Sequence, residues 1–265
     1  MSAMPEPIRD DSLTVCAISV LAGILTDVVH EGLGHGATAL LSGASSGVLS
    51  TVAWSSSFDS RLVDAGGTLA NLLCAIVFWL ILRATKRTSA GWRLFLLLTM
   101  AFNVFTGTGY FLFSGFSNFG DWAQVIAGLP GHWLWRAILV IGGIVSYYAA
   151  ALAVGVALMR YVGVPRADLR RLRKLTLIPY ITSVALAVAG GMLNPMGIRL
   201  ILVSALPATA GGHSAMLWLI YPIAASVSPA RQPESIGRNY SWIASAAVFA
   251  ALFIFVLGRG IVLHR

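Results

Sequence analysis

Long apolar runs separated by short polar stretches dominate this chain of 265 residues. Seven of the runs reach the roughly 20 residues that a helix needs to cross a bilayer. They lie at about residues 13–42, 62–84, 92–114, 134–160, 174–193, 198–225 and 239–262. Apolar positions are continuous within each run and do not alternate, which predicts helices and not the strands of an outer-membrane barrel. The pattern therefore predicts an all-α, polytopic integral membrane protein with about seven transmembrane helices.

Two of these helices are expected to be interrupted. Gly32, Gly34 and Gly36 lie within the first run, which is too long for one straight span. Pro207 and the pair Gly211–Gly212 lie within the sixth run. Interrupted backbone is tolerated at membrane depth where it lines a cavity or packs against protein.

The composition agrees with a membrane protein. Hydrophobic residues make up 57% of the chain and charged residues 11%, whereas a soluble domain carries roughly 25% charged residues. Soluble globular, disordered and disulfide-stapled proteins are therefore excluded. Cys16 and Cys74 lie within apolar runs and are expected to behave as small hydrophobes. Because the chain has no internal repeat, linker or low-complexity tract, residues 1–265 are interpreted as a single transmembrane domain in the lipid bilayer.

The net charge of +8 is interpreted as a signal for membrane topology, and no nucleic-acid partner is expected. Thirteen of the 18 lysines and arginines lie near the N-terminus and at the loops after the second, fourth and sixth helices. This bias predicts a cytoplasmic N-terminus, in what we expect to be a bacterial inner (plasma) membrane. The stretch Arg166–Lys174 is interpreted as part of this signal, with contact to anionic lipids as an alternative.

Polar side chains inside membrane spans are energetically expensive, so each one is a hypothesis for function. They are Asp27, His30, Glu31 and His35 in the first segment, Asp64 and Asn71 in the second, Asp121 after the third and His213 in the sixth. The first segment holds the densest group.

His30-Glu31-x-x-x-His35 is one residue longer than the zinc motif His-Glu-x-x-His, in which two imidazoles one helical turn apart bind the metal. Five residues of ideal α-helix turn by about 500°, which leaves the two rings roughly 140° apart. A π-bulge with i→i+5 hydrogen bonds would return both rings to one face, and such bulges favour functional sites. Gly32 and Gly34 would make that distortion inexpensive.

Other interpretations of this group remain open. Glu31 and His35, four residues apart, could act as the working pair, either as two ligands or as a hydrogen-bonded couple. The group could also be a polar cluster that holds helices together. The expense of burying two histidines and one glutamate within six membrane residues favours a metal site.

Three stretches carry a resemblance to a known family. Residues 30–43 are similar to His-Glu-x-Gly-His-Ala-x-Ala-x-Leu-x-x-Gly with one inserted residue, Gly67-Thr-Leu-Ala-Asn71 to Gly-x-x-x-Asn, and Asp121 to a later metal-binding carboxylate. In this order and spacing, roughly residues 25–136 resemble the site-2-protease class of intramembrane zinc metallopeptidases, particularly its small bacterial peptidase-like branch.

The resemblance implies a metallopeptidase core at about 13–136, followed by additional helices at 137–265. It implies that His30, His35 and Asp121 hold Zn²⁺, that Glu31 is the general base, and that Asn71 positions the substrate backbone or steadies the oxyanion. The substrate would be a membrane-embedded protein or peptide segment. The inserted residue leaves two interpretations, which are a bulged but active site and a degenerate site without peptidase activity.

The predicted helices bring these positions into one leaflet. His30 lies about 26 Å along the first helix from Leu13, at 1.5 Å per residue, close to the far side of a bilayer core of roughly 30 Å. Asp64 and Asn71 enter from that side, and Asp121 follows the helix that ends there. The charge bias places this leaflet outside, whereas the resemblance implies a site toward the cytosol.

Three further residues are secondary candidates. His213 could be a fourth ligand or a substrate contact, or it could pack at a glycine-rich helix break. Asp64 could hydrogen-bond a metal-binding histidine, as metal sites often require, or it could lie hydrated at the interface. Asp27, one turn before Glu31, is expected to be a structural partner.

The leading hypothesis is thus an intramembrane zinc metallopeptidase. A catalytically inactive relative that binds a membrane partner is a second hypothesis. A small transporter, in which buried carboxylates relay protons or ions beside the broken sixth helix, is a third.

Overall fold

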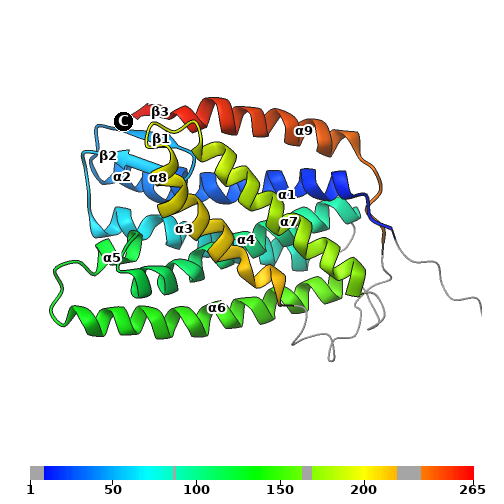
Figure 1. Ribbon diagram of the computed structural model, residues 1–265, viewed down its shortest axis with the longest axis horizontal. Coiled ribbons are helices and arrows are strands. Elements are labelled where there is room, and N and C mark those ends of the chain that lie inside the picture. Colours follow the sequence, from blue (N-terminus) through cyan, green and yellow to red (C-terminus); the bar gives the residue numbers. More distant parts are fainter. Residues whose placement is uncertain (1–8, 86–87, 163–168, 220–233) are drawn as a thin grey trace, which may run out of the picture.

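The computed structural model describes residues 9–85, 88–162, 169–219 and 234–265 and shows a bundle of long helices with a small sheet at one end (Figure 1). Within these residues, seven helical segments are long and apolar enough to cross a membrane. They are Ser12–Ser42, Arg61–Ala84, Ala90–Ser117, His132–Met159, Arg170–Gly191, Ile198–Leu217 and Tyr240–Arg259. The predicted number and order of the spans are confirmed. Residues 220–225 of the sixth predicted run lie outside the described residues.

Most of the spans are single α-helices. These are α3 (Arg61–Ala84), α4 (Ala90–Ser117), α6 (His132–Val162) and α7 (Leu169–Gly191), and a short α5 (Asp121–Val125) lies between α4 and α6. Polar side chains cap several starts, because the first N–H groups of a helix lack intrahelical partners. Ser60 accepts a hydrogen bond from the backbone N–H of Val63, and Ser89 accepts one from that of Trp92.

Both expected interruptions are changes of hydrogen-bonding pattern within a continuing helix. The first span runs from α1 (Ser12–Asp27) through a π-helix, η1 (Val28–Ala37), into α2 (Thr38–Ser42). The sixth runs from α8 (Ile198–Leu200) through the π-helices η2 (Ile201–Ala205) and η3 (Pro207–Gly211) into the 3₁₀-helix η4 (Gly212–Leu217). Pro207 has no backbone N–H to donate, so an ordinary α-helix cannot continue unchanged through it.

The expectation of a purely helical fold is incomplete, because a three-stranded antiparallel sheet covers one end of the bundle. β1 (Ser46–Ser50) lies between β2 (Ala53–Ser56) and β3 (Ile261–His264). The seventh span, α9 (Tyr240–Ala251), η5 (Leu252–Val256) and η6 (Leu257–Arg259), ends at Arg259 and not at residue 262. Gly260, at φ 86°, then turns the chain into β3. Strand pairing between segments more than 200 residues apart has no signature in the local apolar pattern.

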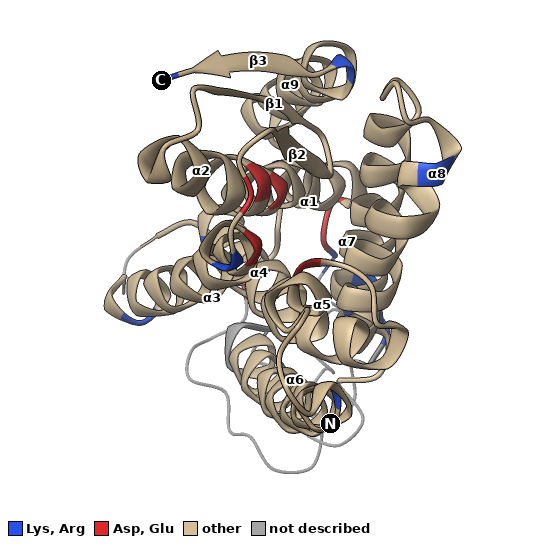
Figure 2. Cartoon of the chain, turned by 90° about the vertical axis from the view of Figure 1, so that its left-hand side faces the viewer, with Lys and Arg blue, Asp and Glu red and all other residues tan. Residues whose placement is uncertain are grey.

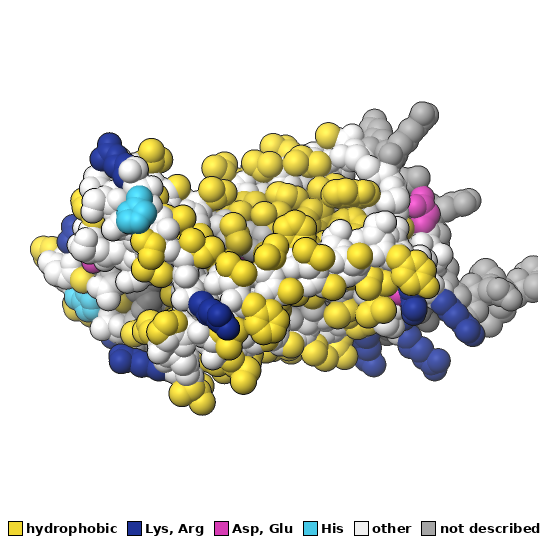
Figure 3. Space-filling view, turned by 90° about the horizontal axis from the view of Figure 1, so that it is seen from above, with side chains coloured by type: hydrophobic (Ala, Val, Ile, Leu, Met, Phe, Trp, Pro, Cys, Tyr) yellow, Lys and Arg dark blue, Asp and Glu magenta, His cyan; other side chains and the backbone are white. Residues whose placement is uncertain are grey.

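The interior is built around α4, and the outer helices expose apolar side chains. Phe102, Phe105 and Leu98 of α4 are fully buried in one cluster with residues of α1, α6 and α7. Large apolar side chains on α3, α6 and α9 are exposed, among them Leu73 and Ile141. Figure 3 shows hydrophobic side chains over the middle of the molecule and most charged ones toward its two ends. This surface is typical of an integral membrane protein.

Acidic and basic residues occupy different parts of the bundle when it is viewed from the end with the sheet (Figure 2). The N-terminal end of α1 lies opposite the sheet and α5 (Figure 1). Figure 2, viewed from the sheet, shows acidic segments around the middle of the bundle, while Lys and Arg lie toward its rim. Several basic residues of the topology argument lie outside the described residues, namely Lys86, Arg87, Arg166 and Arg231.

Candidate metal centre

The π-helix η1 places the two histidines of the first span on one face. The Nε2 atoms of His30 and His35 lie 3.2 Å apart although the residues are five positions apart. Their rings meet edge to face, with centroids 4.8 Å apart. The helix therefore has the distortion that the inserted residue was predicted to require.

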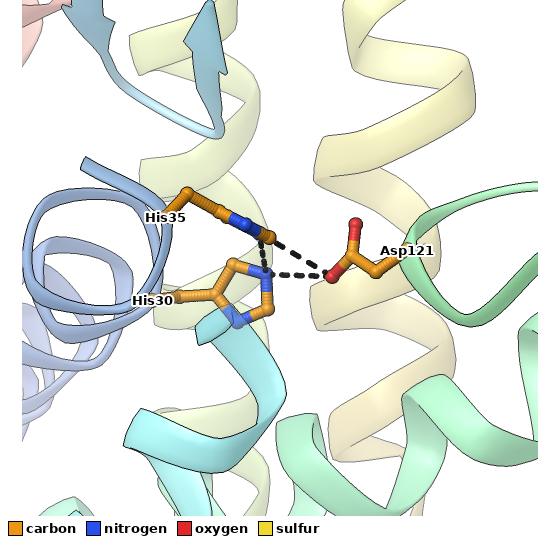
Figure 4. A group of neighbouring side chains, drawn as sticks. All are labelled: His30, His35 and Asp121. Carbon is orange, nitrogen blue, oxygen red and sulfur yellow. Dashed lines mark hydrogen bonds and ion pairs between the residues drawn. The ribbon is translucent and has the colours of Figure 1, made fainter. Parts of the chain in front are cut away.

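Asp121 completes the group from a distant part of the chain. α4 ends at Ser117 and is capped by Asn118 in the left-handed conformation, and Gly120 at φ 84° turns the backbone so that α5 begins at Asp121. The Oδ2 atom of Asp121 lies 3.2 Å from His30 Nε2 and 3.4 Å from His35 Nε2. Figure 4 shows both imidazoles pointing from the first span toward this carboxylate. The three side chains are 5%, 11% and 18% exposed.

Hydrogen bonds on the far side of each ring fix which nitrogen is free. Asn71 directs its carbonyl oxygen at His30, so His30 Nδ1–H donates to Asn71 Oδ1 at 2.5 Å. His35 Nδ1–H donates to the backbone oxygen of Val63 at 2.7 Å. In the neutral rings, both Nε2 atoms then carry lone pairs and no hydrogen. Partners of this kind orient the histidines of metal sites and raise their basicity.

The donor set fits a tetrahedral cation. Among the described residues, the buried Oδ2 of Asp121 has no hydrogen-bond donor, so three acceptor atoms face one another. Ligands held at 2.0–2.2 Å from a tetrahedral Zn²⁺ are about 3.3–3.6 Å apart. The observed separations of 3.2–3.4 Å agree closely with that spacing. His30, His35 and Asp121 are therefore a candidate metal centre.

Electrostatics keep the third donor charged. Burial of the Asp121 carboxyl raises its pKa, but hydrogen bonds from His30 and His35 and the charge of these rings when they are protonated outweigh burial and hold that pKa well below its usual range. Asp121 is therefore a carboxylate that can neutralise part of the charge of a cation.

Glycines let the two helices that build the centre approach each other closely. A Cβ atom added to Gly34 of η1 would lie 2.4 Å from the Cα of Gly67 on α3. A Cβ added to Gly67 would lie 2.4 Å from His35 Nε2 and 2.6 Å from His30 Nε2. The glycine of the Gly-x-x-x-Asn stretch thus leaves the space into which both metal-binding nitrogens point.

Asn71, one turn after Gly67, lies on the Nδ1 side of His30 and not on the Nε2 side that faces His35 and Asp121. It is fully buried, and its Nδ2 donates to the backbone oxygen of Thr26 at 3.2 Å and to Asn103 Oδ1 at 2.7 Å. Asn103 in turn donates to Thr26 Oγ1 at 2.9 Å. All polar atoms of the Asn71 side chain are engaged, so these contacts support a role in orienting His30 and not the expected contact with substrate or oxyanion.

Glu31 lies between two spaces beside the centre. An open groove of about 470 Å³ is lined by Glu31, His35 and Asp121 together with residues of β2 and η2. A smaller internal cavity of about 40 Å³ lies on the other side and is lined by His30, Glu31, Asp27 and His213. The Glu31 side chain is 5% exposed and lies within electrostatic reach of all three donor residues.

The secondary candidates have other partners. His213 is stacked on Phe102 with centroids 4.3 Å apart and contacts Ser183 and Thr106 through its two nitrogens, so it packs in the helix break and is not part of the metal-binding group. The backbone oxygen of Val63, and not the neighbouring Asp64, is the hydrogen-bond partner of His35. Asp64 lines the groove.

Asp27 fixes the tip of the sheet. Its Oδ1 accepts a hydrogen bond from the backbone N–H of Val52 at 3.0 Å. Val52 connects β1 to β2 at φ 56°, a backbone conformation that β-branched residues rarely adopt and that persists only when neighbours hold it. Asp27 is therefore a structural partner of Val52. Val52 belongs to the β1–β2 loop and lines both spaces beside Glu31.

Sequence reasoning missed Tyr110, Thr26, Asn103 and the β1–β2 loop. Tyr110 stacks on His30 with ring centroids 4.8 Å apart. Tyr, Thr and Asn within an apolar helix carry no charge and form no spaced motif, so only the expense of burying Asn103 could have drawn attention to them.

The donor geometry is the feature that characterises this site. Comparisons of the chain with family models, with curated proteins and with solved structures find no match. The conclusion therefore depends on His30, His35 and Asp121, which form a buried three-residue group able to hold a metal ion in a membrane-protein fold.

Proposed function

We propose that this protein is a membrane-embedded zinc metallopeptidase that hydrolyses a peptide bond in a membrane-embedded protein or peptide. The observation that carries the proposal is the convergence of two imidazole Nε2 atoms and one carboxylate oxygen at the spacing of tetrahedral zinc, with Glu31 adjacent. Catalytic zinc sites typically have three protein ligands and a fourth position for water or substrate. This donor set also agrees with the resemblance to site-2-protease-type enzymes.

In the proposed hydrolysis, zinc, Glu31 and the partners of the two histidines would have separate roles. Zinc bound here would supply Lewis-acid polarisation of a peptide carbonyl and of the attacking water. Glu31 would take the proton from that water, as a carboxylate general base, and deliver it to the leaving amine. Asn71 and Val63 would hold His30 and His35 in the tautomer that leaves Nε2 free.

The groove could hold an extended peptide. A helical backbone hides its carbonyls in its own hydrogen bonds, so a membrane-embedded substrate must unwind near the site. β2 lines the groove, and within the described residues it pairs only with β1. Its other edge could therefore pair with an unwound segment, as in other cases of strand addition.

The zinc content of purified protein tests the proposal. We expect about one zinc per protomer in the wild type, as for a three-ligand catalytic site, and loss of zinc in His30→Ala, His35→Ala and Asp121→Ala. His132→Ala is the matched control, because His132 lies at the start of α6 and contacts Asn118. Absence of zinc from wild-type protein purified without chelators would overturn the proposal.

Glu31→Gln separates a peptidase from an inactive relative. The variant should keep its zinc, because Glu31 is not one of the three donors, and should lose cleavage of a membrane-embedded peptide library that the wild type cuts. Zinc binding without cleavage by the wild type would instead support a non-catalytic binding protein.

A further inference from the structure

The proposed hydrolysis requires a hydrogen-bond donor for the carbonyl oxygen of the scissile bond, and this inference rests on that proposed function. Negative charge develops on this oxygen as water adds to the carbonyl carbon, and preorganised donors stabilise it. Asn71 cannot serve, because both hydrogens of its amide are donated to Thr26 and Asn103.

The residues at the junction of the two spaces are the candidates for this donor. Among the residues that the structure describes, four line both the open groove and the internal cavity, and they are Glu31, Val52, Tyr110 and Ser204. These residues therefore lie where the two spaces meet, one of them being Glu31.

Two of the four are already committed to each other. Ser204 Oγ donates its hydrogen to the backbone oxygen of Val52 at 2.7 Å, and the N–H of Val52 is donated to Asp27. Glu31 is a carboxyl group and serves as the base. The Tyr110 hydroxyl is therefore the remaining donor at the junction; its hydrogen-bond partner is the Ser204 side chain, whose place the incoming carbonyl oxygen would take.

Tyr110 is also fixed in place against a metal-binding residue. Its ring stacks on the His30 imidazole, with an interplanar angle of 28° and centroids 4.8 Å apart, and the residue is 9% exposed. Its hydroxyl is hydrogen-bonded to the Ser204 side chain and lies within electrostatic reach of Glu31 and Asp121. The phenol is therefore held beside the centre by packing, which is what preorganisation requires.

We propose that Tyr110 is a further catalytic residue, whose hydroxyl hydrogen-bonds the oxygen of the scissile carbonyl. The water oxygen bonds to the carbonyl carbon, its proton passes to Glu31, and the C=O π electrons move onto the oxygen that Tyr110 contacts. Tyr110 keeps its proton throughout and supplies only a hydrogen bond. When the C–N bond breaks, Glu31 returns the proton to the amine.

Binding of a peptide hydroxamate to zinc-loaded protein tests this role without a known substrate. The hydroxamate carbonyl takes the place of the scissile carbonyl, so Tyr110→Phe should weaken its binding by about 10-fold or more, the effect of losing one hydrogen bond to a charged group. Zinc content should not change, because the phenyl ring keeps the stacking on His30. Tyr147→Phe, which removes the hydroxyl that bonds Gly212 on η4, is the matched control and should bind as the wild type does.

The outcomes distinguish this inference from the proposed function. Equal hydroxamate affinity in wild type and Tyr110→Phe, with zinc bound to both, would overturn the role of Tyr110 and leave the peptidase proposal intact. Wild-type protein that binds no zinc or no hydroxamate would overturn the proposed function and this inference with it. Tyr110→Leu, which removes the aromatic ring as well, should additionally weaken zinc binding.

Discussion

At the residue scale, the centre depends as much on a missing side chain as on those present. The Nε2 atoms of His30 and His35 could not both occupy the space beside Gly67 if α3 carried a larger residue there. A Cβ at that position would lie 2.4–2.6 Å from both nitrogens. Separations under about 3 Å between carbon and such atoms are not tolerated in packed interiors. The site is therefore sensitive to a single methyl group.

Gly67→Ala should abolish stoichiometric zinc binding. The added methyl group occupies the space between the two Nε2 atoms, so either the imidazoles or α3 must move. Zinc per protomer and the thermal unfolding midpoint of purified protein measure the effect. Gly142→Ala on α6 adds the same methyl group where nothing lies within 4 Å, and should leave zinc unchanged. Equal zinc in both variants would contradict this account.

The residue scale also shows where sequence reasoning succeeds and fails. His30 and His35 could be proposed in advance because ionisable groups are rare in membrane spans, whereas Asp121 was proposed as a third ligand only through the family resemblance. The partners of their far nitrogens could not, because Val63 contributes a backbone oxygen, which any residue could supply. The contacts of Asn71 differ from its expected role, since a motif specifies a residue and not the direction of its amide.

At the scale of the element, the π-helix η1 converts an i, i+5 spacing into a shared face. It spans all residues from Val28 to Ala37 and so includes both histidines. Hydrogen bonds of the i→i+5 type widen the helix and absorb one extra residue. The inserted residue and the π-helix are therefore two descriptions of one feature.

Two single-residue deletions test this relation. Deleting Leu33, an exposed residue between the histidines, restores the i, i+4 spacing and should preserve about one zinc per protomer on an ordinary α-helix. Deleting Val28 shortens the same helix equally but keeps the i, i+5 spacing of His30 and His35. On the shortened helix their rings should diverge, and zinc should be lost. The visible spectrum of Co²⁺-substituted protein reports tetrahedral coordination in each. Retention of the metal after both deletions would refute the relation.

The start of α3 is a second element-scale determinant. Ser60 caps this helix through the N–H of Val63, whose carbonyl oxygen accepts the bond from His35. Ser60→Ala should lower the free energy of unfolding by about 0.5–2 kcal/mol. It should also weaken zinc binding, by less than the roughly 10- to 100-fold that direct loss of a ligand's partner causes.

Ser89→Ala provides the matched control for the capping prediction. Ser89 caps α4 in the same way through the N–H of Trp92, but α4 begins at the end of the bundle away from the centre. A similar loss of stability with unchanged zinc affinity is expected. Equal zinc affinity in both variants would show that the α3 cap does not act through Val63.

At the scale of the whole molecule, a buried ion pair joins the N-terminal segment to α7. Arg171 donates to both carboxylate oxygens of Asp10 at 2.7 and 3.0 Å, and their side chains are 2% and 0% exposed. The N–H of Ile236, which precedes α9, also donates to Asp10. This one carboxylate therefore connects three segments far apart in the sequence.

Asp10→Ala should lower the free energy of unfolding by about 3–5 kcal/mol, because it removes the carboxylate from a buried charge pair. Thermal unfolding in detergent measures the loss. Arg238→Ala is the control, since Arg238 pairs with Asp11 at a position where the arginine side chain is 51% exposed and solvent screens the pair. A loss of stability in Asp10→Ala no larger than that in Arg238→Ala would contradict a stabilising role for the buried Asp10–Arg171 pair.

The charge bias predicts an orientation of the molecule in the membrane. The centre lies at the end with the sheet and α5, opposite the N-terminal end that the positive-inside bias predicts to be cytoplasmic. In bacteria expressing a variant without Cys16 and Cys74, a cysteine in place of Ala127 should react with a membrane-impermeant maleimide in intact cells. A cysteine in place of Ser235 should react only after lysis. The reverse pattern would place the centre toward the cytosol, as the family resemblance implies.

The sequence by itself determined the seven spans, because bilayer thickness imposes a length and a composition that each apolar run displays on its own. It also determined which rare ionisable residues could bind a metal, since burying them is expensive wherever they lie. Only the tertiary structure decided which of them meet, which nitrogen of each histidine is free, and that the C-terminal strand β3 pairs with β1. These features depend on contacts between segments that are far apart in the sequence, by more than 200 residues for β1 and β3. A local pattern does not encode such contacts.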